Sequence, residues 1–359
     1  LDPQTGQVAK DWDIRVVSRI ASVPVQIKTL HVRDGYLYIG GSFTHLKGQT
    51  SLTYAYASNL ARIKLSNGEV DWNWRPVFNG TVNGVSASEG NADVYVAGYF
   101  TQLNNQEAFR LAHMQGSSTN PVAWHHRPSY TPKNAQTWDL KNERRMWGFQ
   151  FDVQDAGSSV WVGGTEHMIT RYEKSSMRRT DSAITREGGD FQDLHLSGNT
   201  IYGACHCGDF LFQGADTVYS EWENATNAQT IRLVAAFDKD SGKMLPEFAP
   251  IMNGAYGYGV WESFVDSTGT LWVGGDIRKS LGANGVQQTV GFARYAPRDV
   301  TPTAPPSNLK VTTNGSKDQL TWSGISEHRV KYQVLRDDRP IATVTGTSYS
   351  VDHRDGARY

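Results

Sequence analysis

The sequence has few of the features that would point directly to a function. Of its 359 residues only two are cysteines and 20% are charged, and the formal net charge is -1. So balanced a charge offers no global positive field for nucleic acid or an anionic membrane surface. No apolar run approaches the roughly 20 residues that a membrane-spanning helix needs. We therefore expect no nucleic-acid partner and no direct insertion into a membrane.

Motifs of well-known catalytic centres are missing as well. There is no nucleophile elbow, no phosphate-binding loop and no zinc-protease motif, and we predict neither a cofactor nor a metal. The low cysteine count neither proves nor excludes an oxidising compartment. The chain opens on Leu1-Asp2-Pro3 without a leader or an initiator methionine, so we expect it to be a processed or trimmed part of a longer product.

What the sequence does contain is glycine and aromatic residues, with 35 Gly, 11 Trp and 16 Tyr, a profile typical of β-rich proteins with many turns. One pattern recurs: alternating large apolar residues run into glycine, and the chain then turns polar. The copies are Gly35–Thr44, Asp93–Thr101, Ser159–Gly164 and Thr270–Asp276, with a degenerate copy at Thr200–Cys207. Repetition at this spacing predicts a repeat architecture.

The first full unit predicts the structure of a repeat. Strands are expected at 27–32, 36–41 and 59–65, and Asn67-Gly68 supplies the tight hairpin before a last strand into 72–76. Four antiparallel strands in about fifty residues make one blade of a β-propeller. We therefore predict an all-β protein built on a propeller of four-stranded antiparallel blades. Five blades follow from these residues, and six or seven would be equally natural if upstream sequence is missing.

The fifth unit lacks its fourth strand, and residues 2–12 look like that strand with its preceding turn. If they pair there, the ring closes through the N-terminus and no strand edge is left open. The predicted propeller domain is therefore 1–299. A Pro-rich linker is expected at 300–307, and short alternating strands over 308–359 predict an incomplete immunoglobulin-like sandwich.

Two resemblances accompany this prediction. Pro305-Pro306 with Leu309, Leu320 with Trp322, and Tyr332 to Arg336 are followed by Ser348–Asp352, an order that resembles a fibronectin type III domain truncated at its C-terminus. Gly40–Phe43 with Leu60–Ile63 resembles secreted bacterial repeat propellers, whereas 163–166 and 203–206 depart from that pattern. The resemblance implies an extracellular or surface-attached modular protein, and similar modules occur in phage tails. It implies no specific chemistry.

Candidate binding residues are the polar and aromatic side chains expected at the mouth of the propeller channel, because aromatic rings stack on sugars and polar groups read hydroxyls. They are Arg145, Trp147, Asp190, Gln192, Asp193, Tyr256, Tyr258, Trp261 and Glu262. The alternative is that the rings fill space between blades and the charges pair across a solvated channel. The arginine-rich segment 174–179 is expected at an outer hairpin, as a solvated turn or a polyanion contact.

Cys205-His206-Cys207 is the most unusual local feature. Two thiolates with His195, His167 or His206 could bind a metal, but strand alternation sends His206 to the opposite face from the cysteines. A disulfide or two buried thiols fit the spacing better. His125-His126 is interpreted as the end of a fourth strand.

Three functions remain open. The first is a non-catalytic recognition module, extracellular or on a cell or virion surface, that binds a glycan or protein partner through its channel-mouth loops. The second is a carbohydrate-active enzyme, a glycosidase or lyase, that draws acid and base from Asp190, Asp193 and Glu262, with Glu187 as a further candidate and Arg145 as a substrate clamp. The third is a structural component of a surface or phage-tail assembly, and a homo-oligomer or larger assembly is possible.

Overall fold

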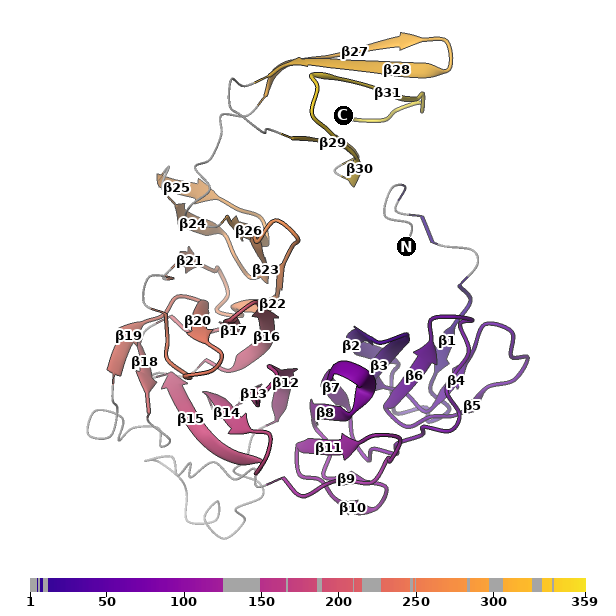
Figure 1. Ribbon diagram of the computed structural model, residues 1–359, viewed down its shortest axis with the longest axis vertical. Helices are drawn as coiled ribbons and strands as arrows, with labels where there is room; N and C mark the ends of the chain where they lie inside the picture. Colours follow the sequence, from indigo (N-terminus) through magenta and orange to yellow (C-terminus); the bar gives the residue numbers. More distant parts are fainter. Residues whose placement is uncertain are drawn as a thin grey trace. The chain divides into compact units, whose positions relative to one another are not determined.

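The computed structural model is almost entirely β-structure (Figure 1). It describes residues 5, 7–8, 12–124, 149–165, 167–185, 189–208, 210–214, 227–245, 248, 250–282, 285–296, 306–324, 331–337 and 339–359. The chain forms two compact units, one made of 14–296 and the other of 1–13 with 297–359. Among the described residues there is one short 3-10 helix, η1 (Glu89–Asn91), and no helix could cross a membrane.

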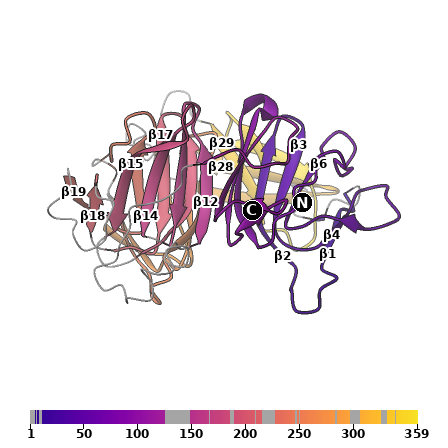
Figure 2. The same cartoon turned by 90° about the horizontal axis from the view of Figure 1, so that it is seen from below.

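The larger unit contains five antiparallel blades, each built on three paired strands, and in the third blade the sheet continues through three further strands. This arrangement confirms the β-propeller prediction. In chain order they are β2 (Gln26–Arg33), β3 (Tyr36–Ser42) and β6 (Leu60–Lys64); β7 (Val82–Ala87), β8 (Asp93–Gly98) and β11 (Leu111–Gln115); β12 (Gln150–Asp155), β13 (Ser159–Gly164) and β14 (Met168–Glu173); β16 (Phe191–Ser197), β17 (Thr200–Cys205) and β20 (Val234–Asp238); and β22 (Val260–Val265), β23 (Leu271–Gly275) and β26 (Phe292–Tyr295). The recurring glycine-ended pattern forms the middle strand of every sheet. The first strands β2, β7, β12, β16 and β22 contact one another in chain order (Figures 1 and 2).

The fourth strand is complete only in the third blade of the described chain, where β15 (Arg178–Thr185) pairs along β14. In the first, second and fourth blades it is reduced to one bridge each: Ile63 with Val70, His113 with Val122, and Phe237 with Met244. The strand predicted through 72–76 is instead a turn, in which the Trp74 N–H is bonded to the Asp71 carbonyl. Trp74 is buried and its ring meets Tyr38 edge-on, so packing outweighs pairing there.

The segments that lead into four of the blades pair with an outer hairpin of that blade. Outer hairpins lie between the second and third strands of four blades: β4 (His45–Lys47) with β5 (Ala55–Tyr56), β9 (Gln102–Leu103) with β10 (Gln106–Glu107), β18 (Phe210–Gln213) with β19 (Asn227–Thr230), and β24 (Lys279–Gly282) with β25 (Gly285–Gln288). The chain leading into each of these blades pairs with its hairpin, as β1 (Arg15–Val17) on β4, Phe78 on Leu103, β15 on β18, and β21 (Ile251–Asn253) on β24. Three of these segments, Phe78, β15 and β21, follow a preceding blade and therefore tie one blade to the next.

The core lies between the blades. Four buried clusters combine the second and third strands of one blade with the first and second strands of the next. Tyr38 and Leu60 of the first blade pack with Val85 of the second, and Tyr95 and Leu111 of the second pack with Val153 of the third. Apolar area is thus removed from water mainly at blade interfaces.

The smaller unit contains two antiparallel sheets. One pairs β27 (Ser307–Asn314), β28 (Lys317–Ser323) and β31 (Ser348–Asp352), and the other pairs β29 (Tyr332–Arg336) and β30 (Arg339–Val344). The rings of Trp322 and Tyr332 meet between them with centroids 5.5 Å apart. This arrangement agrees with the predicted incomplete sandwich, while its membership of the fibronectin type III family stays a prediction. The closing strand at 2–12, the linker at 300–307, Glu187 and His125-His126 lie wholly or largely outside the described residues.

Candidate functional site

The first strand of every blade carries a β-bulge at the same place. The register shifts between Ile27 and Thr29, Val82 and Gly84, Gln150 and Asp152, Phe191 and Asp193, and Val260 and Glu262. A bulge inserts one extra residue and re-aims its side chain. The extra residues are Lys28, Asn83, Phe151, Gln192 and Trp261, so each blade presents one side chain at this level.

Four predicted site residues lie at two of these bulges or directly after them. Gln192 and Trp261 are the bulge residues of the fourth and fifth blades, and Asp193 and Glu262 follow them directly. The sequence therefore selected equivalent positions of two neighbouring blades. Arg145 and Trp147, which were predicted with them, lie outside the described residues.

The carboxylates that follow the bulges hold neighbouring blades together. Asp152 Oδ2 accepts the Leu194 N–H at 2.9 Å, and Asp193 Oδ2 accepts the N–H and the hydroxyl of Ser263 at 2.8 and 2.5 Å. Burial, and then the nearby Glu262, raise the pKa of Asp193 to about 7. Burial and the charge of Asp193 likewise raise the pKa of Asp152. Asp193 can therefore hold a proton near neutral pH, while Oδ2 of each carboxylate already accepts a backbone N–H.

Glu262 is more exposed than the two partly buried carboxylates Asp152 and Asp193. Its side chain keeps a solvent-exposed surface, although neighbouring protein atoms desolvate it enough to raise its pKa. Sequence reasoning missed Asp152, and the signal that could have found it is its position, directly after the bulge in the repeat.

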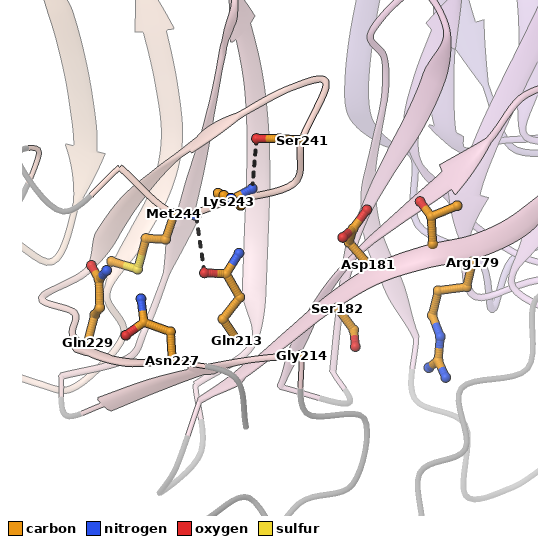
Figure 3. Close-up of a pocket in the computed structure, with 11 residues that line it drawn as sticks. Arg179, Asp181, Ser182, Gln213, Gly214, Asn227, Gln229, Ser241, Lys243 and Met244 are labelled. Carbon is orange, nitrogen blue, oxygen red and sulfur yellow. Dashed lines mark hydrogen bonds between the residues drawn. The ribbon is translucent and has the colours of Figure 1, made fainter. Parts of the chain in front are cut away.

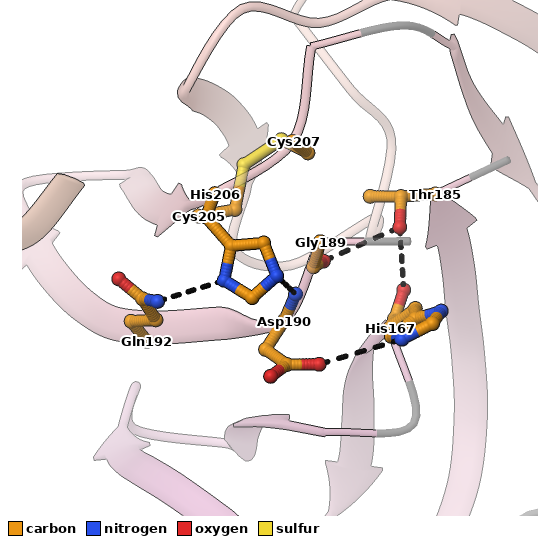
Figure 4. The surroundings of a disulfide bond; sticks show 8 residues. All are labelled: His167, Thr185, Gly189, Asp190, Gln192, Cys205, His206 and Cys207. Atoms are coloured by element: carbon orange, nitrogen blue, oxygen red, sulfur yellow. Dashed lines mark hydrogen bonds and ion pairs between the residues drawn. A yellow bond between two sulfur atoms is a disulfide. The ribbon is translucent and has the colours of Figure 1, made fainter. Parts of the chain in front are cut away.

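Cys205 and Cys207 form a disulfide, which decides among the alternatives left open by the sequence (Figure 4). Both residues are buried, and no cluster of metal-ligating side chains exists within the described ranges. The turn they close lies between the starts of two first strands. A Cβ on Gly189 would come within 2.6 Å of Cys207 Cβ, and one on Gly259 would collide with the Cys205 carbonyl. The disulfide turn thus joins the loops that lead into β16 and β22.

His206, at the tip of this turn, connects Asp190 and Gln192. The Asp190 N–H donates to His206 Nε2 at 3.4 Å, and the Gln192 amide lies 2.9 Å from His206 Nδ1 (Figure 4). A backbone N–H can only donate, so in the neutral ring Nε2 accepts and Nδ1 carries the proton. We assign the Gln192 carbonyl oxygen to the Nδ1 contact, because an amide is oriented by its partners. Its NH₂ group then takes the position that has no partner among the described residues.

Asp190 also faces His167, whose Nε2 lies 3.5 Å from its carboxylate. Burial raises the pKa of Asp190 despite the two neighbouring imidazoles, and burial lowers the pKa of His167. Both shifts favour the uncharged forms, so the contact is weaker than an ion pair between full charges. The predicted residues Asp190 and Gln192 are therefore brought together by His206.

The loop before β22 presents exposed aromatic rings on a fixed backbone. Tyr256 and Tyr258 are 70% and 61% exposed, and their ring centroids lie 6.1 Å apart with planes tilted by 34°. The Asp276 carboxylate accepts backbone N–H groups of Ala255, Tyr256 and Tyr258 at 2.9, 2.6 and 3.3 Å. These bonds hold the pKa of Asp276 below its usual value. The loop is therefore positioned by a carboxylate, and its rings stay free of the core.

A cationic side chain lies against one of these rings. The Arg278 Nη2 donates to the Tyr256 hydroxyl at 3.0 Å, with the guanidinium 5.1 Å from the Tyr256 ring centroid. Trp261, the bulge residue of β22, is 49% exposed. We call Tyr256 and Tyr258 the aromatic platform. Asp276 and Arg278 were not selected from the sequence, although Asp276 directly follows the recurring glycine pair.

A separate polar cavity of about 810 Å³ lies beside β15, β18 and β19 (Figure 3). It is lined by Arg179, Thr180, Asp181, Ser182, Gln213, Gly214, Asn227, Gln229, Ser241, Lys243 and Met244. Gln213 fixes one wall by donating to the Gly242 carbonyl at 2.8 Å and accepting the Met244 N–H at 3.4 Å. Arg179 belongs to the arginine-rich segment predicted at an outer hairpin, and none of the predicted site residues lines this cavity.

Comparisons with known proteins give no family. No family model matches the chain, and no curated protein matches it. Among solved structures, BamB from Moraxella catarrhalis is 11% identical with a TM-score of 0.38, covering 86% of this chain and 97% of BamB. An extracellular domain of the one component system BT4673 from B. thetaiotaomicron is 14% identical with a TM-score of 0.37, covering 83% of this chain and 38% of that one. The computationally designed Ika8 protein is 8% identical with a TM-score of 0.36, covering 83% and 80%. Values this low carry no function to this chain.

Proposed function

We propose that the propeller unit is a non-catalytic recognition module that binds a glycan through the aromatic platform. One observation carries the proposal. Tyr256 and Tyr258 present two exposed rings on a loop whose backbone N–H groups are hydrogen-bonded to the Asp276 carboxylate. Exposed rings on a preformed surface suit the apolar faces of a sugar, and they lose little conformational freedom on binding. Arg278, Asp276 and Glu262 supply polar groups for hydroxyls.

The disulfide supports an extracellular or cell-surface location. Structural disulfides persist in oxidising compartments and are rare in reducing ones. Cys205 and Cys207 are buried beneath the loops of the site, so the bond is part of the framework that carries the platform.

A carbohydrate-active enzyme is the second candidate, and the raised pKa values of Asp193, Glu262 and Asp190 favour it, since a general acid needs a raised pKa. Against it, Asp193 already accepts two hydrogen bonds from Ser263. An architectural role in a surface assembly is the third candidate.

The test is a polysaccharide array scored for both retention of the protein and release of product. Glycans that are retained are then titrated by calorimetry against wild type, Tyr256→Ala and Tyr258→Ala. We expect each substitution to weaken affinity at least tenfold, because the sugar ring loses the aromatic side chain on which it stacks. Tyr56→Ala is the matched control, since Tyr56 is 51% exposed on a different hairpin.

The outcomes separate the candidates. Product release would replace recognition by the enzyme. Equal affinity of the two tyrosine variants and wild type would remove the platform from the proposal. A blank array together with capture of a surface protein through the same tyrosines would move the ligand from glycan to protein.

A further inference from the structure

The four interfaces between neighbouring blades bury equivalent strand positions. On the side that faces the following blade, the first residue of the third strand that pairs with the middle strand is buried, as for Leu60, Leu111, Ile169 and Val234, which are 1%, 3%, 1% and 1% exposed. On the side that faces the preceding blade, the second residue after the bulge is buried, as for Val85, Val153, Leu194 and Ser263, which are 4%, 2%, 3% and 2% exposed. Each interface thus has two defined halves.

The two outer blades expose the same positions. Phe292 of the fifth blade corresponds to Leu60 and is 69% exposed, and Leu30 of the first blade corresponds to Val85 and is 63% exposed. We call Phe264, Trp272 and Phe292 the trailing face, and Ile27, Leu30 and Val32 the leading face. Their members are 56%, 39% and 69%, and 42%, 63% and 60% exposed. Contiguous exposed apolar side chains of this kind mark an interaction surface.

The faces are complementary in register and in charge. At the interior interfaces Asp152 and Asp193 accept a backbone N–H from the first strand of the following blade. Glu262 occupies the equivalent position on the trailing face and is exposed. Lys28 is the exposed bulge residue of the leading face. A trailing face set against a leading face in the repeat register would bring this carboxylate toward that ammonium group.

We propose that the trailing face binds the leading face of a second copy of this chain. Every chain carries both halves of the interface, each exposed on its own propeller unit, so another copy supplies the missing half of each. The contact is head-to-tail, and contacts of that type close into a ring or extend into a filament depending on the rotation between copies. The second copy would also continue the row of bulge residues beyond Trp261. This proposal does not depend on the proposed glycan.

The test introduces one cysteine on each face, Leu30→Cys with Phe292→Cys, in the full chain. The native cysteines are paired with each other, so mild oxidation acts on the introduced thiols. We expect covalent dimers and higher oligomers on non-reducing gels. Leu52→Cys with Phe292→Cys is the collision control, because Leu52 is 95% exposed and lies outside both faces.

Light scattering across a concentration series gives the second readout. Wild type is expected to gain mass with concentration, Leu30→Glu to stay monomeric, and Leu52→Glu to behave as wild type. Three results would overturn the proposal: a cross-link confined to single chains, which means that the ring closes on itself; cross-linking equal to the control pair; or a monomer at every concentration.

Discussion

At the scale of single residues, the second glycine of the recurring pattern is set by the facing strand. A Cβ at Gly41, Gly98 or Gly275 would collide with the carbonyl oxygen of Gln26, Thr81 or Gly259. In the fourth blade this position is Cys205, and the following backbone hydrogen bond, from His206 N–H to the Asp190 carbonyl, is 3.3 Å long. The corresponding bond from Tyr99 to Thr81 is 2.8 Å. The exception therefore costs the blade some of its pairing.

Substitution of one such glycine tests this reasoning. Gly98→Ala should lower the free energy of unfolding by about 1–3 kcal/mol, because the backbone must move to admit a methyl group. Gly208→Ala is the control, since its Cβ would meet only Arg232 Nη1 at 3.7 Å, and it should stay within about 0.5 kcal/mol of wild type. Urea midpoints measure both. Equal midpoints would show that the strand adapts to a Cβ without cost.

At the scale of elements, the first strands couple neighbouring blades through partly buried acids. Asp193 reaches from β16 to the Ser263 backbone on β22, in a position equivalent to that of Asp152 on β12. The bulge makes this reach possible, because it re-aims the residues around it. Because the pKa of Asp193 is raised in the folded protein, the stability of the fold should depend on pH.

The direction of this pH dependence follows from the number of protons bound in the folded and unfolded states. Asp193 has a pKa of about 7 in the folded protein and near 4 when unfolded, so between these values the folded state holds a proton that the unfolded state has lost. Its contribution is complete below about pH 4 and is lost as the pH rises through 7. Histidines with lowered pKa values, such as His195, act in the opposite direction.

Asp193→Asn isolates the contribution of this acid. The stability of the variant relative to wild type at the same pH should increase as the pH rises from 5 to 8. The reason is that the amide cannot ionise, while its oxygen still accepts from Ser263. Chemical denaturation at both pH values measures the difference. A wild-type-to-variant difference that does not change with pH would contradict the raised pKa.

At the scale of the whole propeller unit, the described interior blades pack against a neighbour on both sides, whereas the first and fifth blades each pack against one described neighbour. Ile169 and Phe292 occupy equivalent strand positions but are 1% and 69% exposed. The same repeat position therefore has opposite energetic weight in different blades, because burial comes from the neighbour and not from the residue.

A pair of alanine substitutions measures that difference. In dilute solution Ile169→Ala should cost about 2–5 kcal/mol, as buried aliphatic truncations do, whereas Phe292→Ala should cost about 0.5 kcal/mol or less. Urea unfolding at low protein concentration is the measurement. A large loss for Phe292→Ala under those conditions would show that the trailing face is covered within one chain.

The sequence by itself determined the all-β class and the five glycine-ended strands, and it limited Cys205 and Cys207 to a disulfide, two buried thiols or a metal site, among which the structure decided. These follow from local chemistry: alternation, the turn residues and the spacing of two cysteines. It also selected Gln192, Asp193, Trp261 and Glu262 as polar and aromatic residues of the channel-mouth loops, and their role in binding stays a prediction. Only the tertiary structure decided that the connections between blades pair with the next hairpin, that Asp152 and Asp276 hold backbone from distant segments, and that Leu30 and Phe292 are exposed. Those contacts join residues far apart in the chain, and no local pattern encodes the neighbour that each one meets.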